Sequence, residues 1–140
     1  MTRLRGSSNV DGVVIESTGE VQVPSGLLEL DGNDIGGTQV TIADDAVASI
    51  TPPRTGGFMF MSANGNSDYP QSGLSSYFLY DTGASFGIND LLNKTYVDAV
   101  TTDVTGTTGV DGNVTVGLQY KTIKIENRSG QSRTFQITFL

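Results

Sequence analysis

The sequence of 140 residues contains no cysteine and no histidine. Disulfides, thiolate nucleophiles, cysteine–histidine zinc sites and serine–histidine–aspartate triads are therefore excluded. Carboxylate, lysine or tyrosine chemistry would remain for an enzyme, but no pair of carboxylates is singled out by its position. The Gly-x-x-x-x-Gly-Lys phosphate loop is also missing. We expect a protein that is not an enzyme and that has no cofactor and no resident metal.

Positive charge is scarce in the first third of the chain. The formal net charge is −7, and the segment from Gly6 to Pro53 has eight acidic residues and no basic one. Such a segment repels a phosphate backbone, so nucleic acid is excluded as a partner.

Long apolar runs are missing too, which predicts no membrane insertion. The first eight residues also lack the apolar stretch of a secretory signal, so we expect the chain to fold in a cytoplasm.

Glycine, threonine, serine, asparagine and valine dominate the composition, which predicts an all-β protein with many turns. Pro52 and Pro53 interrupt the chain between two regions of different pattern. Because proline cannot donate to a strand ladder, residues 52–56 are expected to form a stiff connector. The connector divides the chain into residues 11–51 and residues 57–140.

The first of these regions is punctuated by Gly12, Gly19 and Gly26, each of which opens a short apolar segment. The interval of about seven residues between these glycines leaves room for strands of about four residues. Such strands are too short to bury a core within one chain. We therefore predict strands over residues 13–16, 20–23, 26–30 and 38–42 that intertwine with other copies, with a turn over residues 31–37. The expected oligomer contacts are Val13, Ile15, Val21, Val23, Leu27, Leu28 and Leu30.

Acidic residues gather in three places that favour turns over cation sites. These are Asp31 with Asp34, the pair Asp44–Asp45, and Asp111 before Gly112. Carboxylates on an oligomer axis that trap a cation remain the alternative. Residues 46–50, after the aspartate pair, fit a capped helical turn and a short strand equally well.

Apolar alternation marks the second region. Strands are expected over residues 57–61, 74–80, 96–102, 113–120, 121–126 and 133–139. The alternation places Val114, Val116 and Leu118 on one face, and likewise Phe135, Ile137 and Phe139. Period-two segments separated by turns predict a small antiparallel β-sandwich of jelly-roll type. Tyr77, Phe78 and Tyr80 are interpreted as core and subunit interface rather than as a sugar platform.

The polar loop over residues 62–73 is the candidate recognition element of this sandwich. Long polar loops on rigid sandwiches are frequent sites of recognition, and tyrosine with asparagine suits sugars and protein surfaces. The expected contact residues are Asn64, Asn66, Asp68, Tyr69 and Gln71. A loop that binds nothing is the alternative.

Four phrases carry a resemblance to a known class of proteins. Residues 12–26, 30–36, 48–58 and 125–139 resemble fibre and spike proteins of tailed bacteriophages. The resemblance implies a homotrimer, with a pentamer as the alternative, located in the virion after assembly in the host bacterial cytoplasm. It implies that residues 1–10, with Arg3, Leu4 and Arg5, dock to a capsid or tail protein. Residues 11–51 would form an intertwined β stalk, and residues 57–140 an exposed head.

The expected function is that of a non-enzymatic virion component that decorates the capsid or tail and contacts the host surface. Many tail fibres are several times longer, so the length favours a head fibre, capsid decoration or small tail-tip appendage. A carbohydrate-binding tip that recognises a bacterial surface glycan is the first alternative. A polysaccharide depolymerase and a cellular adhesin fragment are weaker ones.

Overall fold

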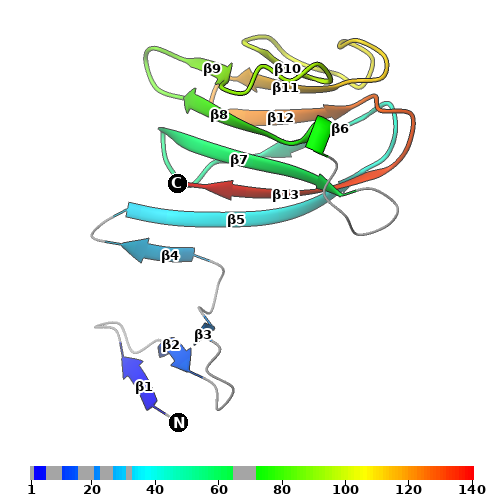
Figure 1. The fold of residues 1–140 in the computed structure, drawn as a ribbon. Helices are drawn as coiled ribbons and strands as arrows, with labels where there is room; N and C mark the ends of the chain where they lie inside the picture. The colour runs from blue at the N-terminus through cyan, green and yellow to red at the C-terminus, as the bar shows by residue number, and fades with distance from the viewer. Residues whose placement is uncertain (1, 6–10, 16–20, 23–26, 31–32, 65–71) are drawn as a thin grey trace.

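A computed structural model describes residues 2–5, 11–15, 21–22, 27–30, 33–64 and 72–140 (Figure 1). For β1 to β4 and the first residues of β5 it describes the backbone only. The strands are β1 (Thr2–Arg5), β2 (Asp11–Ile15), β3 (Val21–Gln22), β4 (Leu27–Leu30), β5 (Asn33–Ile42), β6 (Ala46–Ile50), β7 (Gly56–Asn64), β8 (Ser76–Asp81), β9 (Gly87–Asp90), β10 (Val97–Val100), β11 (Val114–Gln119), β12 (Thr122–Asn127) and β13 (Arg133–Phe139). The 3-10 turn η2 spans Ser72–Leu74, and the described residues contain no α-helix. The all-β prediction is confirmed.

Two sheets form a sandwich. The six-stranded sheet has the order β4-β5-β13-β7-β8-β9 and is antiparallel throughout, whereas the four-stranded sheet has the order β10-β11-β12-β6. In the latter sheet β10 runs parallel to β11, and the other pairs are antiparallel. A third, small sheet of β1-β2-β3 lies apart from the sandwich (Figure 1).

The core lies between the two sheets and follows from the alternation of apolar residues. Met59, Met61, Phe78, Tyr80, Phe135, Ile137 and Phe139 face inward from the six-stranded sheet. Val114, Val116, Leu118, Ile123 and Ile125 meet them from the four-stranded sheet. All of these side chains are buried, so the period-two pattern identified the inner face of β11, β12 and β13.

The long connection between β10 and β11, residues 101–113, covers the outer face of the four-stranded sheet. A parallel strand pair needs such a crossover. Val104 is only 1% exposed, and its methyl groups lie above Gly117 of β11. A β-carbon at Gly117 would come within 2.8 Å of the Thr102 carbonyl oxygen, so glycine is what allows this close approach.

Several local expectations need correction. The turn predicted over residues 31–37 is wrong from Asn33 onward, because β5 begins there and pairs with β4. Residues 46–50 form the strand β6 rather than a helical turn, since β6 is held along its length by β12. β9 was not predicted.

The boundary of the predicted stalk also moves. β5 pairs with β13 and β6 pairs with β12, so residues 33–50 belong to the two sheets of the C-terminal region. The sandwich therefore extends to the N-terminal side of the proline-containing connector. Its topology departs from a jelly roll, because a jelly roll is built from two Greek keys of antiparallel strands. Here the chain changes sheet only after β5, β6, β9 and β12.

Candidate interaction surface

An apolar strip lies on the outer face of the six-stranded sheet. It consists of Phe58 and Phe60 on β7 and of Tyr77 and Leu79 on β8. The register places Phe58 opposite Leu79 and Phe60 opposite Tyr77. The Phe60 and Tyr77 ring centroids are 4.7 Å apart, with the planes tilted by 34°. Phe58, Tyr77 and Leu79 remain 49%, 45% and 43% exposed, which is unusual for neighbouring large apolar residues on a monomer surface.

Leu91, whose amide donates to the Tyr77 carbonyl at 2.8 Å, adds a further exposed apolar side chain beside the strip. The other outward-facing residues are polar and almost free of charge. Among the described side chains, the register places these residues beside the strip: Gln39, Thr41, Ser62, Asn64, Asn89, Thr134, Gln136 and Thr138. Asp81, at the end of β8, is the one charged residue in the outward-facing rows described for β5, β13, β7, β8 and β9. Its carboxylate accepts a hydrogen bond from the Gly83 amide at 2.6 Å. The surface is therefore apolar at its centre and neutral at its rim.

The opposite outer face of the sandwich is closed by residues 101–113. The buried Glu126 carboxylate accepts hydrogen bonds from the Gly106, Thr108 and Gly109 amides, at 2.7, 2.8 and 2.7 Å. Lys124 pairs with Asp103 beside it. These contacts hold the connection against the four-stranded sheet, so the six-stranded sheet provides the open face of the sandwich.

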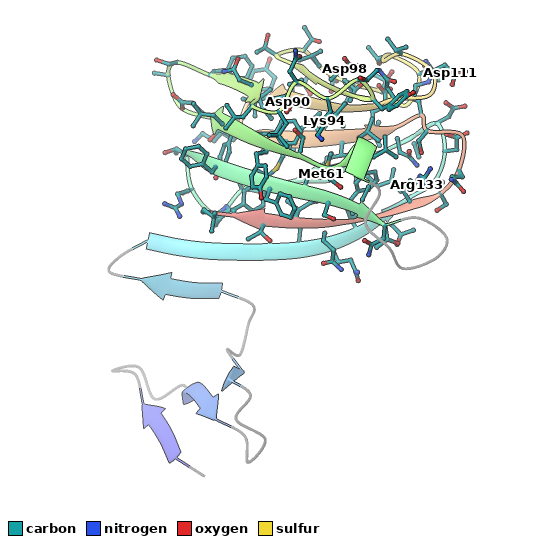
Figure 2. The ribbon with its side chains drawn as sticks, in the orientation of Figure 1. Met61, Asp90, Lys94, Asp98, Asp111 and Arg133 are labelled. Carbon is teal, nitrogen blue, oxygen red and sulfur yellow. The ribbon has the colours of Figure 1, made fainter. Side chains whose placement is uncertain are left out.

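Charged residues lie elsewhere on the molecule. Figure 2 shows Asp98 and Asp111 near β10 and the connection that follows it, away from β5 and β13. Asp98 accepts a hydrogen bond from the Asn113 side-chain amide at 2.8 Å. Asp90 accepts bonds from the Leu92 and Lys94 amides at 3.0 and 3.2 Å. These carboxylates hold loops in place through hydrogen bonds, and none of them lies on the apolar strip.

Hydrogen bonding shifts the pKa of two partly buried charged groups. The hydrogen bond from Lys124 lowers the pKa of the Asp103 carboxyl. The hydrogen bond to Asp45, from Arg128 Nε to Oδ1 at 3.1 Å, raises the pKa of the Arg128 guanidinium. In the core, burial raises the pKa of the Tyr80 phenol. None of these three groups belongs to the apolar strip.

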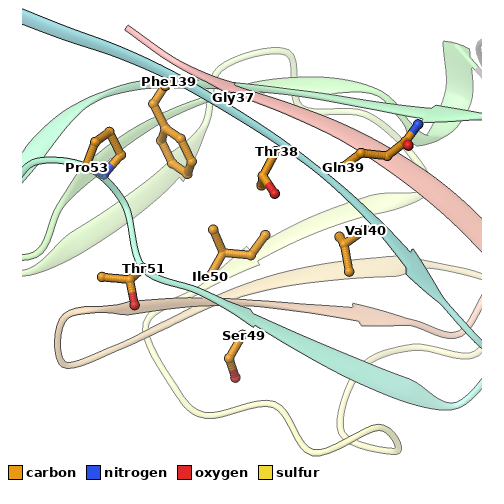
Figure 3. A pocket seen from close by; sticks show the side chains of 10 residues that line it. Gly37, Thr38, Gln39, Val40, Ser49, Ile50, Thr51, Pro53 and Phe139 are labelled. Atoms are coloured by element: carbon orange, nitrogen blue, oxygen red, sulfur yellow. The ribbon is translucent and has the colours of Figure 1, made fainter. Parts of the chain in front are cut away.

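A cleft of about 470 Å³ opens at the side of the sandwich between β5 and β6. Figure 3 shows Thr38 between Phe139, Ile50 and Val40 in this space. The four-stranded sheet ends at β6, whereas the six-stranded sheet continues past β5 to β4. In the described part of the chain, β4 therefore has no strand of the second sheet opposite it.

The structure describes one of the predicted recognition residues. Asn64 ends β7, opposite Thr134 on the outer face of the six-stranded sheet, and is half-buried. Asn66, Asp68, Tyr69 and Gln71 lie outside the described residues. Recognition by this loop stays a prediction.

The predicted attachment and stalk residues are described by their backbone only. Arg3, Leu4 and Arg5 lie in β1, which pairs with β2. Val13 and Ile15 lie in β2, Val21 in β3, and Leu27, Leu28 and Leu30 in β4. Val23 lies outside the described residues. β4 joins the sandwich through β5, while β1 to β3 form a sheet of their own.

At the turn predicted over Asp44 and Asp45, both carboxylates accept hydrogen bonds. Asp44 accepts a bond from the Gly130 amide at 2.9 Å, and Asp45 binds Arg128. Asp45 has a positive φ of 53°, as a turn residue can. No group of three or more acidic residues able to hold a metal ion occurs among the described residues. That part of the chain also contains no helix long and apolar enough to cross a membrane.

The sequence contains a signal for the apolar strip. Residues 57–61 are apolar at successive positions, so both faces of β7 are apolar. Such a strand is typical of sheets covered on both sides. Phe78 and Tyr80 are core residues as expected, and Tyr77 lies on the outer face.

No protein-family model, curated protein or solved structure gives a significant match to this chain. Its function has to be inferred from its own residues.

Proposed function

We propose that this chain is a non-enzymatic structural component of a bacteriophage virion. It forms a short oligomeric fibre or spike on the capsid or tail, as a homotrimer, with a pentamer as the alternative closed symmetry. Residues 1–10, with Arg3, Leu4 and Arg5, dock to a capsid or tail protein. Residues 11–32 intertwine as the stalk, and the sandwich is the exposed head.

The observation that carries this proposal is the uncovered apolar strip. Three large apolar side chains, Phe58, Tyr77 and Leu79, remain nearly half exposed on adjacent strands. Their burial against another copy removes apolar area from water, and this is the main favourable term in obligate association. A surface of this kind supports an oligomeric structural role over that of a self-contained enzyme.

The distribution of charge supports self-association through the same face. Each chain has a net charge of −7, so copies repel one another over most of their surfaces. The outer face of the six-stranded sheet holds Asp81 as its one described charge, at the end of β8. Like-charged copies can therefore meet here with little Coulomb penalty.

The position of β4 supports an intertwined segment. β4 extends the six-stranded sheet beyond β6, the last strand of the opposing sheet. Leu27, Leu28 and Leu30 lie on this strand. A strand at a sheet edge with few neighbours needs a partner for stability, and another copy of the same segment supplies one. The four sequence phrases that resemble phage fibres point in the same direction.

The test is the location of the protein in bacteria that produce the phage encoding it. Particles are banded in a density gradient, and each fraction is probed with an antibody against the sandwich. We expect the protein to co-sediment with intact particles and the antibody to label their surface in electron micrographs. Protein found only in the soluble fraction, with unlabelled particles, would contradict the proposal.

A further inference from the structure

Two turns from different sheets meet at one end of the sandwich. The connection from β8 to β9 and the turn from β11 to β12 both lie at the left end in Figure 1. Between them is a hollow of about 650 Å³. Its lining residues are Thr82, Gly83, Phe86, Tyr120, Lys121 and Thr122. The hollow shares no residue with the apolar strip, so it calls for a separate explanation.

Tyr120 has a backbone conformation that tyrosine rarely adopts. It is the first residue of the two-residue turn between Gln119 and Thr122, and its φ is +53°. Glycine or asparagine is usual at such a position, and a side chain with a β-carbon costs about 1 kcal/mol there. The tyrosine is 80% exposed, so packing of its ring does not compensate. Strain without a packing benefit points to a functional use of the ring.

The second aromatic residue of the hollow is also accessible. Phe86 is 39% exposed and lines the same space as Tyr120. Thr122 adds a hydroxyl group, and the Thr82 hydroxyl, which donates to the Thr55 carbonyl at 3.0 Å, can still accept. An apolar lining with a few polar groups is the usual character of a small-ligand site. Aromatic rings with hydroxyl groups match a sugar ring, which has an apolar C–H face and a rim of hydroxyls.

The charge of the lining narrows the class of ligand. Lys121 is the one charged residue among those that line the hollow. The chain as a whole has a net charge of −7. At the hollow, however, the Lys121 ammonium group attracts an anionic group of a ligand and repels a cationic one. A sugar that has a carboxylate fits both the rings and the lysine.

We propose that the hollow between the β8–β9 connection and the β11–β12 turn binds one acidic sugar residue of an oligosaccharide. The ring of the sugar lies against Tyr120 and Phe86, and its carboxylate pairs with Lys121. This site shares no residue with the apolar strip.

The test uses the full-length protein and a panel of defined oligosaccharides, in which hexuronate-containing and sialylated members are matched by neutral ones. Retained members are then titrated by calorimetry. We expect retention of acidic members only. Tyr120→Asn, which suits the turn but lacks the ring, should weaken binding about tenfold or more. Its thermal unfolding midpoint should stay equal or rise, because the backbone strain is relieved.

Two further variants separate the ring from the charge. Tyr120→Phe keeps the stacking surface and should keep binding within about threefold. Lys121→Gln should weaken binding of acidic members and remove the dependence of that binding on salt.

Three results would overturn the proposal. They are a failure to retain any acidic member, retention that Tyr120→Asn does not diminish, and a lower oligomer mass for Tyr120→Asn. The last would identify the hollow as a subunit contact. Failure of the oligomer proposal is recognised separately, because it would leave sugar binding by the hollow intact.

Discussion

The Tyr80 side chain brings a polar hydroxyl group into the core of the sandwich. Tyr80 is 2% exposed and packs edge-on against Phe139, with ring centroids 5.7 Å apart. Its hydroxyl has no hydrogen-bond partner among the described residues. Burial therefore opposes ionisation of the phenol, and its pKa is raised from the ordinary value of 10.0.

Tyr80→Phe should be neutral or stabilising by up to about 1 kcal/mol at neutral pH, because no hydrogen bond to a described residue is lost. In the wild type the unfolded phenol ionises before the folded one. The contribution of Tyr80 to stability is thus complete below the ordinary pKa and declines as the pH rises through the raised pKa. Unfolding midpoints measured across this alkaline range should fall less steeply for Tyr80→Phe. An equal slope would contradict the argument, and Tyr120→Phe, an exposed tyrosine, is the matched control.

Asp103 gives the opposite pH dependence. Its pKa is lowered by the hydrogen bond from Lys124, so its contribution to stability is present above the ordinary carboxyl pKa. That contribution disappears as the pH falls through the lowered pKa. Asp103→Asn should therefore have a lower unfolding midpoint than the wild type near pH 7, and the two should converge near about pH 2. A difference that is the same at both pH values would show that charge is not its cause.

Secondary-structure elements show how one sheet face was closed and the other left open. The connection over residues 101–113 has little regular structure, yet Val104 is buried against β11. Three of its amides converge on Glu126 of β12. The carboxylate is thus the anchor of the whole connection.

Glu126→Ala should destabilise the protein by roughly 3–5 kcal/mol, because three inward-facing amides lose their acceptor. Glu126→Gln retains one carbonyl acceptor and should cost less. Denaturant unfolding measures both, and hydrogen exchange should show faster exchange of the Gly106, Thr108 and Gly109 amides. A loss below about 1 kcal/mol for the alanine variant would contradict an anchoring role.

The elements also show how far the sequence determines the fold. Alternation identified β11, β12 and β13, because most of their inward residues are apolar. β9 escaped detection because Ile88 is its one apolar residue, and its pairing with β8 defines the strand. Gly36 and Gly37 favour a turn at the start of β5, but both pair with residues of β13. The parallel pairing of β10 with β11 depends on long-range contacts that no local pattern reveals.

The candidate surface shows the same division between local and long-range information. That Tyr77 and Phe78 lie on opposite faces of the sheet could be predicted from the alternation along β8. That Phe58 and Leu79 adjoin Tyr77 required the register between β7 and β8. That this face is open required the position of residues 101–113 on the other sheet. The sequence thus predicts which residues are apolar, but the topology decides which of them remain exposed.

At the scale of the whole molecule, the exposed face of the six-stranded sheet and the extension by β4 are two surfaces that the described part of the chain does not cover. The closed face and the charged loops lie on other sides. A homo-oligomer that buries the apolar strip accounts for this asymmetry. In that arrangement the hollow at Tyr120 is presented independently of the interface.

The most direct test of this account is the solution mass of the full-length chain by light scattering at neutral pH. We expect a trimer for the wild type and for Val110→Glu, which places the same charge at a 63% exposed apolar residue of the 101–113 connection. Leu79→Glu should dissociate into smaller species, because it places a carboxylate at the centre of the interface. A monomeric wild type, or a Leu79→Glu variant with unchanged mass, would contradict the assignment of the apolar strip as the subunit interface.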